Sequence, residues 1–141
     1  MQMNAKLMQL DGLAMMGKGD TGHWVAMDAP DKLGGHGAGS RPMELMLICI
    51  AGCAAMDIIA ILKKKRVDLR GFEVDADAER SDEHPQLFKK IVFNYTVIGK
   101  NIQAKDVERS IELTDTNYCG AIENVRSSVE IVHNFTIKDV D

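Results

Sequence analysis

The feature that most constrains the fold is a long apolar segment in the first half of the chain. Between Met43 and Leu62 only Glu44 and Asp57 carry a charge, and the run Leu45–Met56 has no charged side chain at all. A membrane span needs about 20 largely apolar residues, so this twelve-residue run is too short for one, and Asp57 would be costly in lipid. The segment therefore predicts a helix that is buried on nearly all sides in a protein core.

The residues at both ends fit this helix. Ser40 is expected to cap its N-terminus, and Pro42 suits its first turn. The basic run Lys63–Arg66 lies at its C-terminal end, where positive charge favours the helix dipole. A helix that is apolar on every side needs partners on every side, and a chain of 141 residues offers few. We therefore expect a dimer with this helix near the shared core.

The chain before the helix is predicted to form strands and turns. The expected strands are Lys6–Leu10, Leu13–Met16 and His23–Met27, with turns at Asp11-Gly12 and Gly17–Asp20. The glycine-rich segment Lys32–Gly39 is expected to be a flexible linker into the helix. It lacks the Lys-Ser/Thr ending of a phosphate-binding loop.

The chain after the helix alternates apolar and polar residues in several places. Strands are expected over Phe72–Glu79, Ile91–Val97 and Val129–Ile137, a helix over Gln103–Leu113, and a short turn or helix over Tyr118–Val125. Strands and helices do not alternate regularly, which indicates an α+β fold with an antiparallel sheet and a long buried helix. The length suits a single domain over residues 1–141.

Charge and cysteine content limit the classes of partner and compartment. The net charge of -4 argues against nucleic acid or an anionic membrane as a partner, since both attract clustered Lys and Arg. Three cysteines are too few for a disulfide-stapled secreted scaffold, and the N-terminal residues lack the apolar core of a secretion signal. We expect a cytoplasmic protein with reduced thiols.

The cysteines are the first candidates for chemistry. Cys53 lies among small residues within the apolar helix, and Cys119 follows the second helix. Two cysteines in different elements can meet in the fold and cycle between dithiol and disulfide, or each can be a small buried hydrophobic residue. Cys49 and Cys53 share one helical face with Cβ atoms ~5–6 Å apart, whereas a disulfide prefers about 3.8 Å.

Other polar residues leave alternatives open. Asp57, one turn after Cys53, can raise the pKa of the neighbouring thiol, pair with a basic group or bind a backbone amide. Zinc would need two histidines beside Cys49 and Cys53, and no histidine has a supporting spacing, so we expect no metal and no cofactor. His133 lies on the apolar face of its strand and is interpreted as a core histidine with satisfied hydrogen bonds.

Four short motifs together resemble the OsmC/Ohr family, the osmotically induced and organic hydroperoxide resistance proteins. They are Gly39–Leu45, Gly52-Cys53 within the apolar helix, Glu83-His84-Pro85 and Tyr118-Cys119. The order of elements is similar to that of the family from about Lys6 to Ile137, and the YhfA-like branch is the most similar.

The resemblance implies a fold, an assembly and a reaction. It implies an intertwined homodimer with two active sites at the subunit interface. Cys53 would attack the O–O bond of an organic hydroperoxide and become a sulfenic acid. Cys119 would then form a disulfide with Cys53, and an external thiol reductant would reduce this disulfide.

The residues around the helix start differ from the usual family pattern. The peroxidases usually carry a Glu directly after the proline, whereas Met43 stands there and Glu44 follows. Arg41 and Glu44 are the candidates for activating the thiolate of Cys53, with Lys18 and Lys32 as alternative cations. The alternative function is a non-catalytic binding module that holds a small hydrophobic ligand at the dimer interface, with Met43, Met46 and Met56 lining an adaptable pocket.

Overall fold

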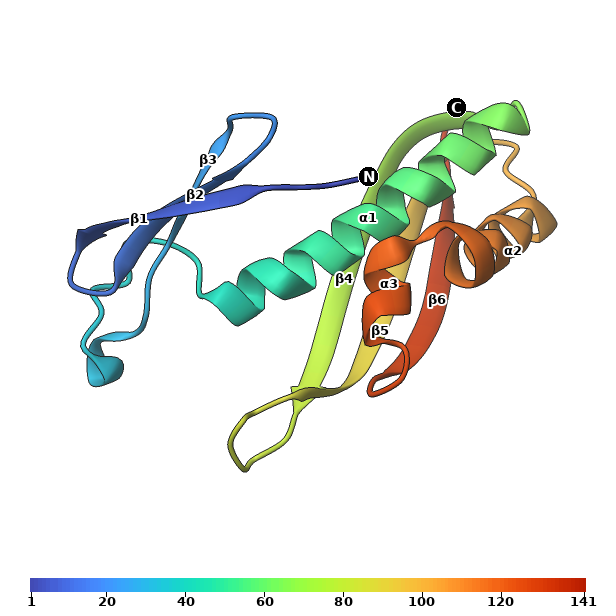
Figure 1. The fold of residues 1–141 in the computed structure, drawn as a ribbon. Helices are drawn as coiled ribbons and strands as arrows, with labels where there is room; N and C mark the ends of the chain where they lie inside the picture. Colours follow the sequence, from blue (N-terminus) through green and yellow to red (C-terminus); the bar gives the residue numbers. More distant parts are fainter. The chain divides into compact units, whose positions relative to one another are not determined.

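The computed structural model describes residues 1–141, and the chain forms two compact units, Met1–Met46 and Leu47–Asp141. The boundary between them falls within the long helix α1 (Pro42–Lys64). Strands and helices do not alternate regularly along the chain, as Figure 1 shows, and the predicted α+β class is confirmed.

The first unit holds a three-stranded antiparallel sheet in the order β1-β2-β3. Its strands are β1 (Ala5–Asp11), β2 (Ala14–Gly19) and β3 (Trp24–Met27). The predicted hairpin turn at Asp11-Gly12 is confirmed, and Gly12 has the left-handed φ of 57° that such turns favour. The predicted turn at Gly17–Asp20 is wrong in part, because Gly17 pairs with Leu7 and Val25 inside the central strand.

The segment predicted as a flexible linker is organised around the carboxylate of Asp28. This carboxylate accepts hydrogen bonds from the backbone N–H groups of Ala29 at 2.7 Å and of His36 and Ala38 at 3.1 Å each. Asp28 is only 2% exposed. Gly35 is needed here because a Cβ would lie 1.9 Å from the carbonyl oxygen of Ala29. The loop also contains the short 3₁₀ helix η1 (Asp31–Leu33) and is ordered by buried polar contacts.

Helix α1 begins differently from the prediction. Ser40 does not cap it, because Ser40 pairs with Met27 in an isolated parallel bridge. Arg41 occupies the N-cap position, where its carbonyl accepts the first helical hydrogen bond from Leu45 at 3.0 Å. The carboxylate of Glu44 accepts a hydrogen bond of 3.0 Å from the backbone N–H of Arg41, as in half of a capping box.

The second unit holds a mixed sheet in the order β4-β5-β6. Strands β4 (Asp68–Arg80) and β5 (Phe88–Lys100) are antiparallel, whereas β6 (Glu130–Asp139) runs parallel to β5. The prediction of a purely antiparallel sheet is therefore wrong for the last strand. The reason is the connection between β5 and β6, a helical crossover of the kind that joins parallel strands.

This crossover consists of three consecutive helical elements. They are α2 (Ala104–Leu113), the π-helical turn η2 (Thr114–Tyr118) and α3 (Gly120–Val125). The predicted helix over Gln103–Leu113 is confirmed, and the short element predicted near Tyr118–Val125 corresponds to the end of η2 and to α3.

The core of the second unit lies between the sheet and the helices on one of its faces (Figure 1). Helix α1 contributes a buried stripe, and β5 contributes every second residue of its central part. The members of the core that are fully or almost fully buried are Ile50, Ala54, Ile58, Leu62, Ile91, Phe93, Tyr95, Val97, Val107 and Ile122.

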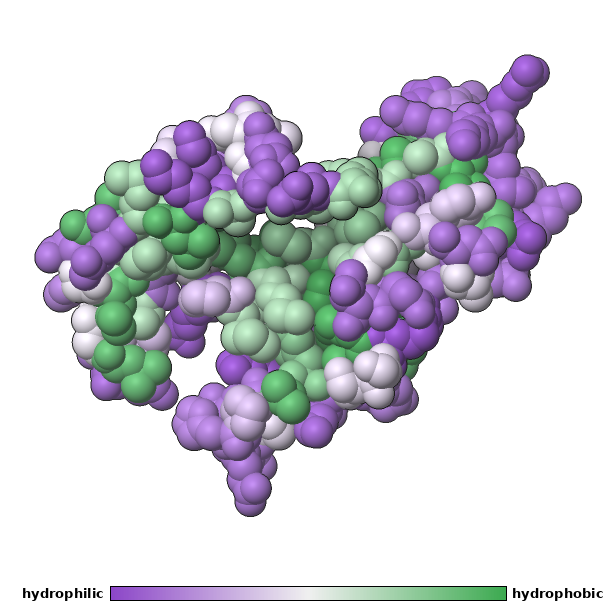
Figure 2. All heavy atoms as spheres, viewed as in Figure 1, coloured by the Kyte–Doolittle hydropathy of each residue, from purple (hydrophilic) through white to green (hydrophobic).

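Three large apolar side chains of α1 lie outside this core. Met46, Ile48 and Met56 are 40%, 58% and 72% exposed, and Figure 2 shows hydrophobic residues at the surface over α1 and over the first unit. The predicted burial on nearly all sides assumed a dimer, and within the single chain one face of α1 is buried. By length and composition alone α1 could cross a membrane, a test that core helices of soluble proteins also pass.

Candidate functional site

The second unit brings three reactive side chains together where α1 meets α3. The Sγ atoms of Cys53 and Cys119 and a carboxylate oxygen of Asp57 all lie within 4.8 Å of one another. We call these three residues the thiol–carboxylate group. Cys119 is buried, whereas Cys53 and Asp57 are half-buried.

Local structure places each member of this group. Cys53 and Asp57 are four residues apart on α1, a spacing that puts both side chains on one face of a helix. Cys119 is the residue before α3, and its Sγ accepts a hydrogen bond of 3.5 Å from the backbone N–H of Ile122. The π-helical turn η2 ends at Tyr118, directly before Cys119. Such turns are frequent at functional sites.

The environment keeps the Cys119 thiol protonated near neutral pH. Burial raises the pKa of this thiol, and although the N–H of Ile122 acts to lower the pKa, the adjacent Cys53 raises it further, to about 11. A thiol with this pKa is a poor nucleophile in its resting state. Cys119 is therefore suited to react second, once an electrophilic sulfur has formed beside it.

All three cysteines are free thiols in this structure. Cys49, one helical turn before Cys53, is exposed and does not belong to the thiol–carboxylate group. The structure thus brings together the pair Cys53 and Cys119 from different elements and leaves Cys49 apart.

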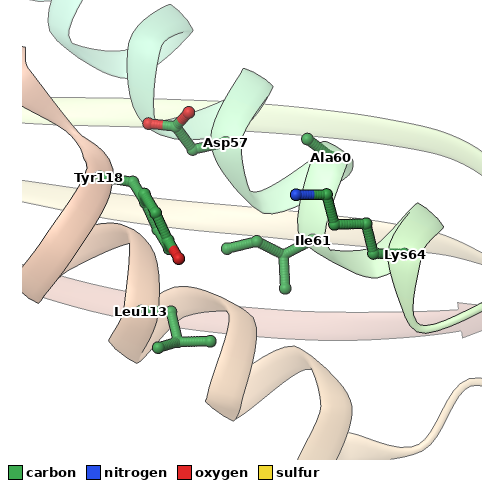
Figure 3. Close-up of a pocket in the computed structure, with 6 residues that line it drawn as sticks. All are labelled: Asp57, Ala60, Ile61, Lys64, Leu113 and Tyr118. Carbon is green, nitrogen blue, oxygen red and sulfur yellow. The ribbon is translucent and has the colours of Figure 1, made fainter.

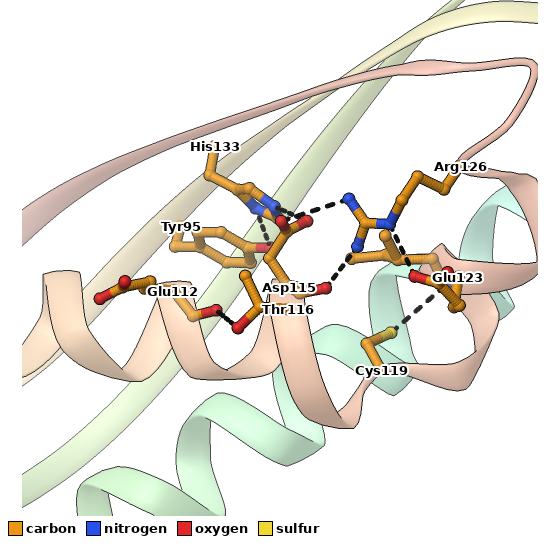
Figure 4. Close-up of polar contacts among 9 residues, drawn as sticks. Tyr95, Glu112, Asp115, Thr116, Cys119, Glu123, Arg126 and His133 are labelled. Carbon is orange, nitrogen blue, oxygen red and sulfur yellow. Dashed lines mark hydrogen bonds and ion pairs between the residues drawn. The ribbon is translucent and has the colours of Figure 1, made fainter.

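A polar network holds the segment that precedes Cys119 (Figure 4). Asp115, within η2, contacts the Nε2 atom of His133 at 3.1 Å and the Nη1 atom of Arg126 at 3.4 Å. The Nδ1 atom of His133 lies 2.9 Å from the hydroxyl of Tyr95, which burial keeps protonated by raising its pKa. Arg126 also donates to the backbone carbonyl of Asp115 and to the carboxylate of Glu123. The network ties η2 to β5, β6 and α3.

The interpretation of His133 as a core histidine with satisfied hydrogen bonds is confirmed by these contacts. Its neighbour Asp115 stays charged despite its partial burial. Desolvation acts to raise the pKa of Asp115, but the hydrogen bonds from His133 and Arg126 outweigh it, and the pKa is lowered. Neither Asp115 nor Arg126 was predicted, because the sequence has no local pattern that joins β6 to a turn eighteen residues earlier.

Two pockets border the thiol–carboxylate group. One has a volume of about 230 Å³ and is shown in Figure 3, where residues of α1 form one side and Leu113 and Tyr118 form the other. Its lining residues are Asp57, Ala60, Ile61, Lys64, Leu113 and Tyr118. The other has a volume of about 200 Å³ and is lined by Cys119 and its neighbours in η2 and α3. Tyr118 takes part in both, so each pocket contains one member of the group and a shared aromatic wall.

The two predicted activating residues are joined to each other at the start of α1. Arg41 and Glu44 belong to the first unit, and the Glu44 carboxylate is engaged by the Arg41 backbone N–H. The thiol–carboxylate group contains neither residue. Their proposed action on the Cys53 thiolate stays a prediction.

Comparison with known proteins shows the family of this chain. Residues 35–134 match the family model described as OsmC-like protein, which spans more than half of the chain. The chain belongs to the OsmC-like protein family. It is 33% identical over 135 residues to Protein YhfA of Escherichia coli K12, covering 96% of this chain and 98% of that protein. The resemblance to this family seen in the sequence is thereby confirmed.

Several solved structures share the fold. A hypothetical protein from Aquifex aeolicus is 23% identical with a TM-score of 0.88, over 100% of this chain and 99% of that one. An organic hydroperoxide resistance protein from Legionella pneumophila is 15% identical with a TM-score of 0.72, over 96% of this chain and 97% of that one. Redox and hydroperoxide-resistance proteins are thus found among the structural neighbours of this OsmC-like chain.

Proposed function

We propose that this OsmC-like protein is a thiol peroxidase that reduces organic hydroperoxides through Cys53 and Cys119. The observation that carries the proposal is the approach of the two Sγ atoms to within 4.8 Å in a chain that belongs to this family. A disulfide needs an S–S distance of about 2.05 Å, so a modest shift of the two side chains closes it.

The reaction balances in three steps. The Cys53 thiolate attacks the distal peroxide oxygen, so that an S–O bond forms, the O–O bond breaks, and the alkoxide leaves as an alcohol after taking a proton. The thiol of Cys119 then attacks the sulfenic sulfur, forming the S–S bond and releasing the hydroxyl with the thiol proton as water. An external thiol reductant supplies two electrons and restores both thiols by disulfide exchange.

The pocket beside Asp57 supports an alkyl peroxide as the substrate. Ala60, Ile61 and Leu113 give it apolar walls, and its volume of about 230 Å³ suits a small organic molecule. Each methylene group buried there would contribute about 0.8 kcal/mol, a gain that hydrogen peroxide cannot obtain. We therefore expect the protein to prefer alkyl hydroperoxides over hydrogen peroxide.

Two further proposals concern the setting of this reaction. We propose a homodimer, which the exposed apolar side chains of α1 and of the first sheet support, since monomers rarely leave so many of them uncovered. We also propose a cytoplasmic location, because three free thiols suit a reducing compartment.

A consumption assay tests the proposed activity. Wild-type protein with excess dithiol and a chelator should turn over an alkyl hydroperoxide, and Cys53→Ser should reduce this rate at least a hundredfold because it removes the attacking sulfur. Cys49→Ser, which removes a cysteine on the same helix outside the group, is the matched control and should keep the wild-type rate. Equal consumption by Cys53→Ser and wild type would refute the proposal.

The second candidate function is a binding module for a small hydrophobic ligand. The exposure of Met46 and Met56 and the protonated state of Cys119 favour it. In that case the thiols of folded protein would stay unreacted with alkyl hydroperoxide, and native mass spectrometry would show a copurified small molecule.

A further inference from the structure

The same three side chains have the composition of a metal site. Thiolate sulfur and carboxylate oxygen are ligands that zinc and cobalt accept, and Cys53, Cys119 and Asp57 offer two of the first kind and one of the second. We propose that the reduced protein binds one zinc-type divalent cation at the thiol–carboxylate group. This activity goes beyond the proposed peroxidase and does not require it.

The spacing of the ligand atoms suits one ion. Three atoms no more than 4.8 Å apart can all lie within about 2.8 Å of a common point. Zinc binds sulfur at about 2.3 Å and carboxylate oxygen at about 2.0–2.2 Å. A contraction of roughly half an ångström per ligand would therefore complete coordination, which side-chain rotation alone can provide.

The surroundings also favour an open site. Three protein ligands leave the fourth tetrahedral position free, as in zinc sites that exchange water or substrate. Asp57 lines the pocket of about 230 Å³, so this position has access to a small molecule. Lys64 lines the same pocket, and its ammonium group offsets the net negative charge of an ion held by two thiolates and one carboxylate (Figure 3).

Metal binding would oppose the redox cycle of these cysteines. When the cation binds, each thiol gives its proton to solvent and forms a sulfur–metal bond, with no change in oxidation state. A sulfur that is engaged in this way cannot attack a peroxide or its partner sulfur. Zinc occupancy would thus hold the reduced protein inactive and shield both thiols.

Cobalt(II) alone is the probe, because a cobalt ion that is bound by thiolate has its own absorption band. Reduced, metal-free protein is titrated with cobalt chloride in the absence of peroxide, and we expect one thiolate-bound cobalt per chain. Asp57→Asn and Cys119→Ser should each weaken binding at least tenfold, since each removes a ligand. Cys49→Ser and Asp75→Asn, an exposed carboxylate on β4, are the matched controls and should bind as wild type.

Three results would each overturn the proposal. The first is the absence of a thiolate–cobalt band in wild type at saturating cobalt. The others are equal cobalt affinity of Asp57→Asn and wild type, and a loss of cobalt affinity in Cys49→Ser as large as that in Asp57→Asn. Should Cys119→Ser fail to fold, Asp57→Asn still decides, since Asp57 is only half-buried. The titration contains no peroxide and the peroxidase assay is run with a chelator, so either activity can fail while the other stands.

Discussion

At the scale of single residues, the burial of Cys119 determines its chemistry. Its side chain is 2% exposed, and the pKa of its thiol is raised to about 11. Removing it from water disfavours the charged thiolate, and the backbone N–H groups of Ile122 and Ala121 do not compensate. The Cys119 thiol is therefore expected to react slowly with external reagents near neutral pH.

The raised pKa of Cys119 predicts its reactivity toward an alkylating reagent. The rate of Cys119 alkylation in folded protein should rise about tenfold per pH unit between pH 7 and 10, because the fraction of thiolate rises by the same factor. Mass spectrometry of quenched samples measures this rate, with the unfolded protein as control, whose rate should level off near pH 9. A plateau at pH 8 in the folded protein would contradict the assignment.

The lowered pKa of Asp115 predicts how stability depends on acid. Because the folded protein releases this proton more readily than the unfolded chain, the carboxylate stabilises the fold above about pH 4, and this contribution is lost as the pH falls through the folded pKa. Asp115→Asn should therefore lower the free energy of unfolding by about 1 kcal/mol at pH 7. In urea titrations the gap between variant and wild type should shrink at pH 3, and a gap that is constant with pH would contradict the role of the charge.

At the scale of elements, one face of α1 packs into the core and another carries the thiol–carboxylate residues Cys53 and Asp57. Ile50, Ala54, Ile58 and Leu62 repeat at a spacing of four and pack into the core of the second unit. Cys53 and Asp57 present chemistry to η2 and α3, while Met56 points outward. Apolar side chains therefore lie on both the buried and the exposed faces of α1.

Two substitutions on α1 separate packing from exposure. Ile58 is fully buried, so Ile58→Ala should lower the free energy of unfolding by about 2–4 kcal/mol through lost contacts and a cavity. Met56, two residues earlier, is 72% exposed. Met56→Ala should therefore change the free energy of unfolding by less than about 0.5 kcal/mol under conditions that keep the chain monomeric. Equal losses in chemical denaturation would show that the helix packs differently.

The sequence predicted most elements because their patterns are local. The alternation in Phe72–Glu79 and the apolar run in α1 each need only neighbouring residues to be recognised. The direction of β6 was not predictable, since a period of two is the same in parallel and antiparallel strands. The ordered Asp28 loop was missed because its three N–H donors come together only in the folded backbone.

The sequence predicted part of the candidate site, as it did part of the fold. The spacing of Cys53 and Asp57 places them together on any helix. From the residues alone, Cys119 could meet Cys53 or stay apart, and the family resemblance favoured the meeting that the structure shows. The network of Asp115, His133 and Arg126 joins residues whose nearness follows from the crossover and from no local pattern.

At the scale of the whole molecule, the single chain leaves much apolar surface uncovered. All seven residues of β1 are exposed, and Leu7, Leu10 and Trp24 in the first unit are 53%, 62% and 42% exposed. Together with Ile48 and Met56 on α1, these side chains would favour association by the hydrophobic effect. A second copy of the chain is the partner that we propose.

Sedimentation equilibrium tests this proposal. At micromolar concentration the protein should have twice the mass of the 15.6 kDa chain. The double variant Ile48→Glu/Met56→Glu should shift the equilibrium toward the monomer, because each substitution buries a charge in an apolar interface. The control Glu73→Gln, on the exposed face of β4, should leave the equilibrium unchanged. A wild-type protein that stays monomeric at these concentrations would contradict the dimer.

The central claim is that Cys53 and Cys119 act as a redox pair, and locating a disulfide tests it most directly. Reduced protein is mixed with a slight excess of alkyl hydroperoxide in the presence of a chelator, quenched within seconds and mapped by peptide mass spectrometry. We predict a Cys53–Cys119 disulfide that forms equally in Cys49→Ser and is absent from Cys53→Ser. Thiols that remain unreacted in folded wild-type protein, or a disulfide that involves Cys49 instead, would contradict the account.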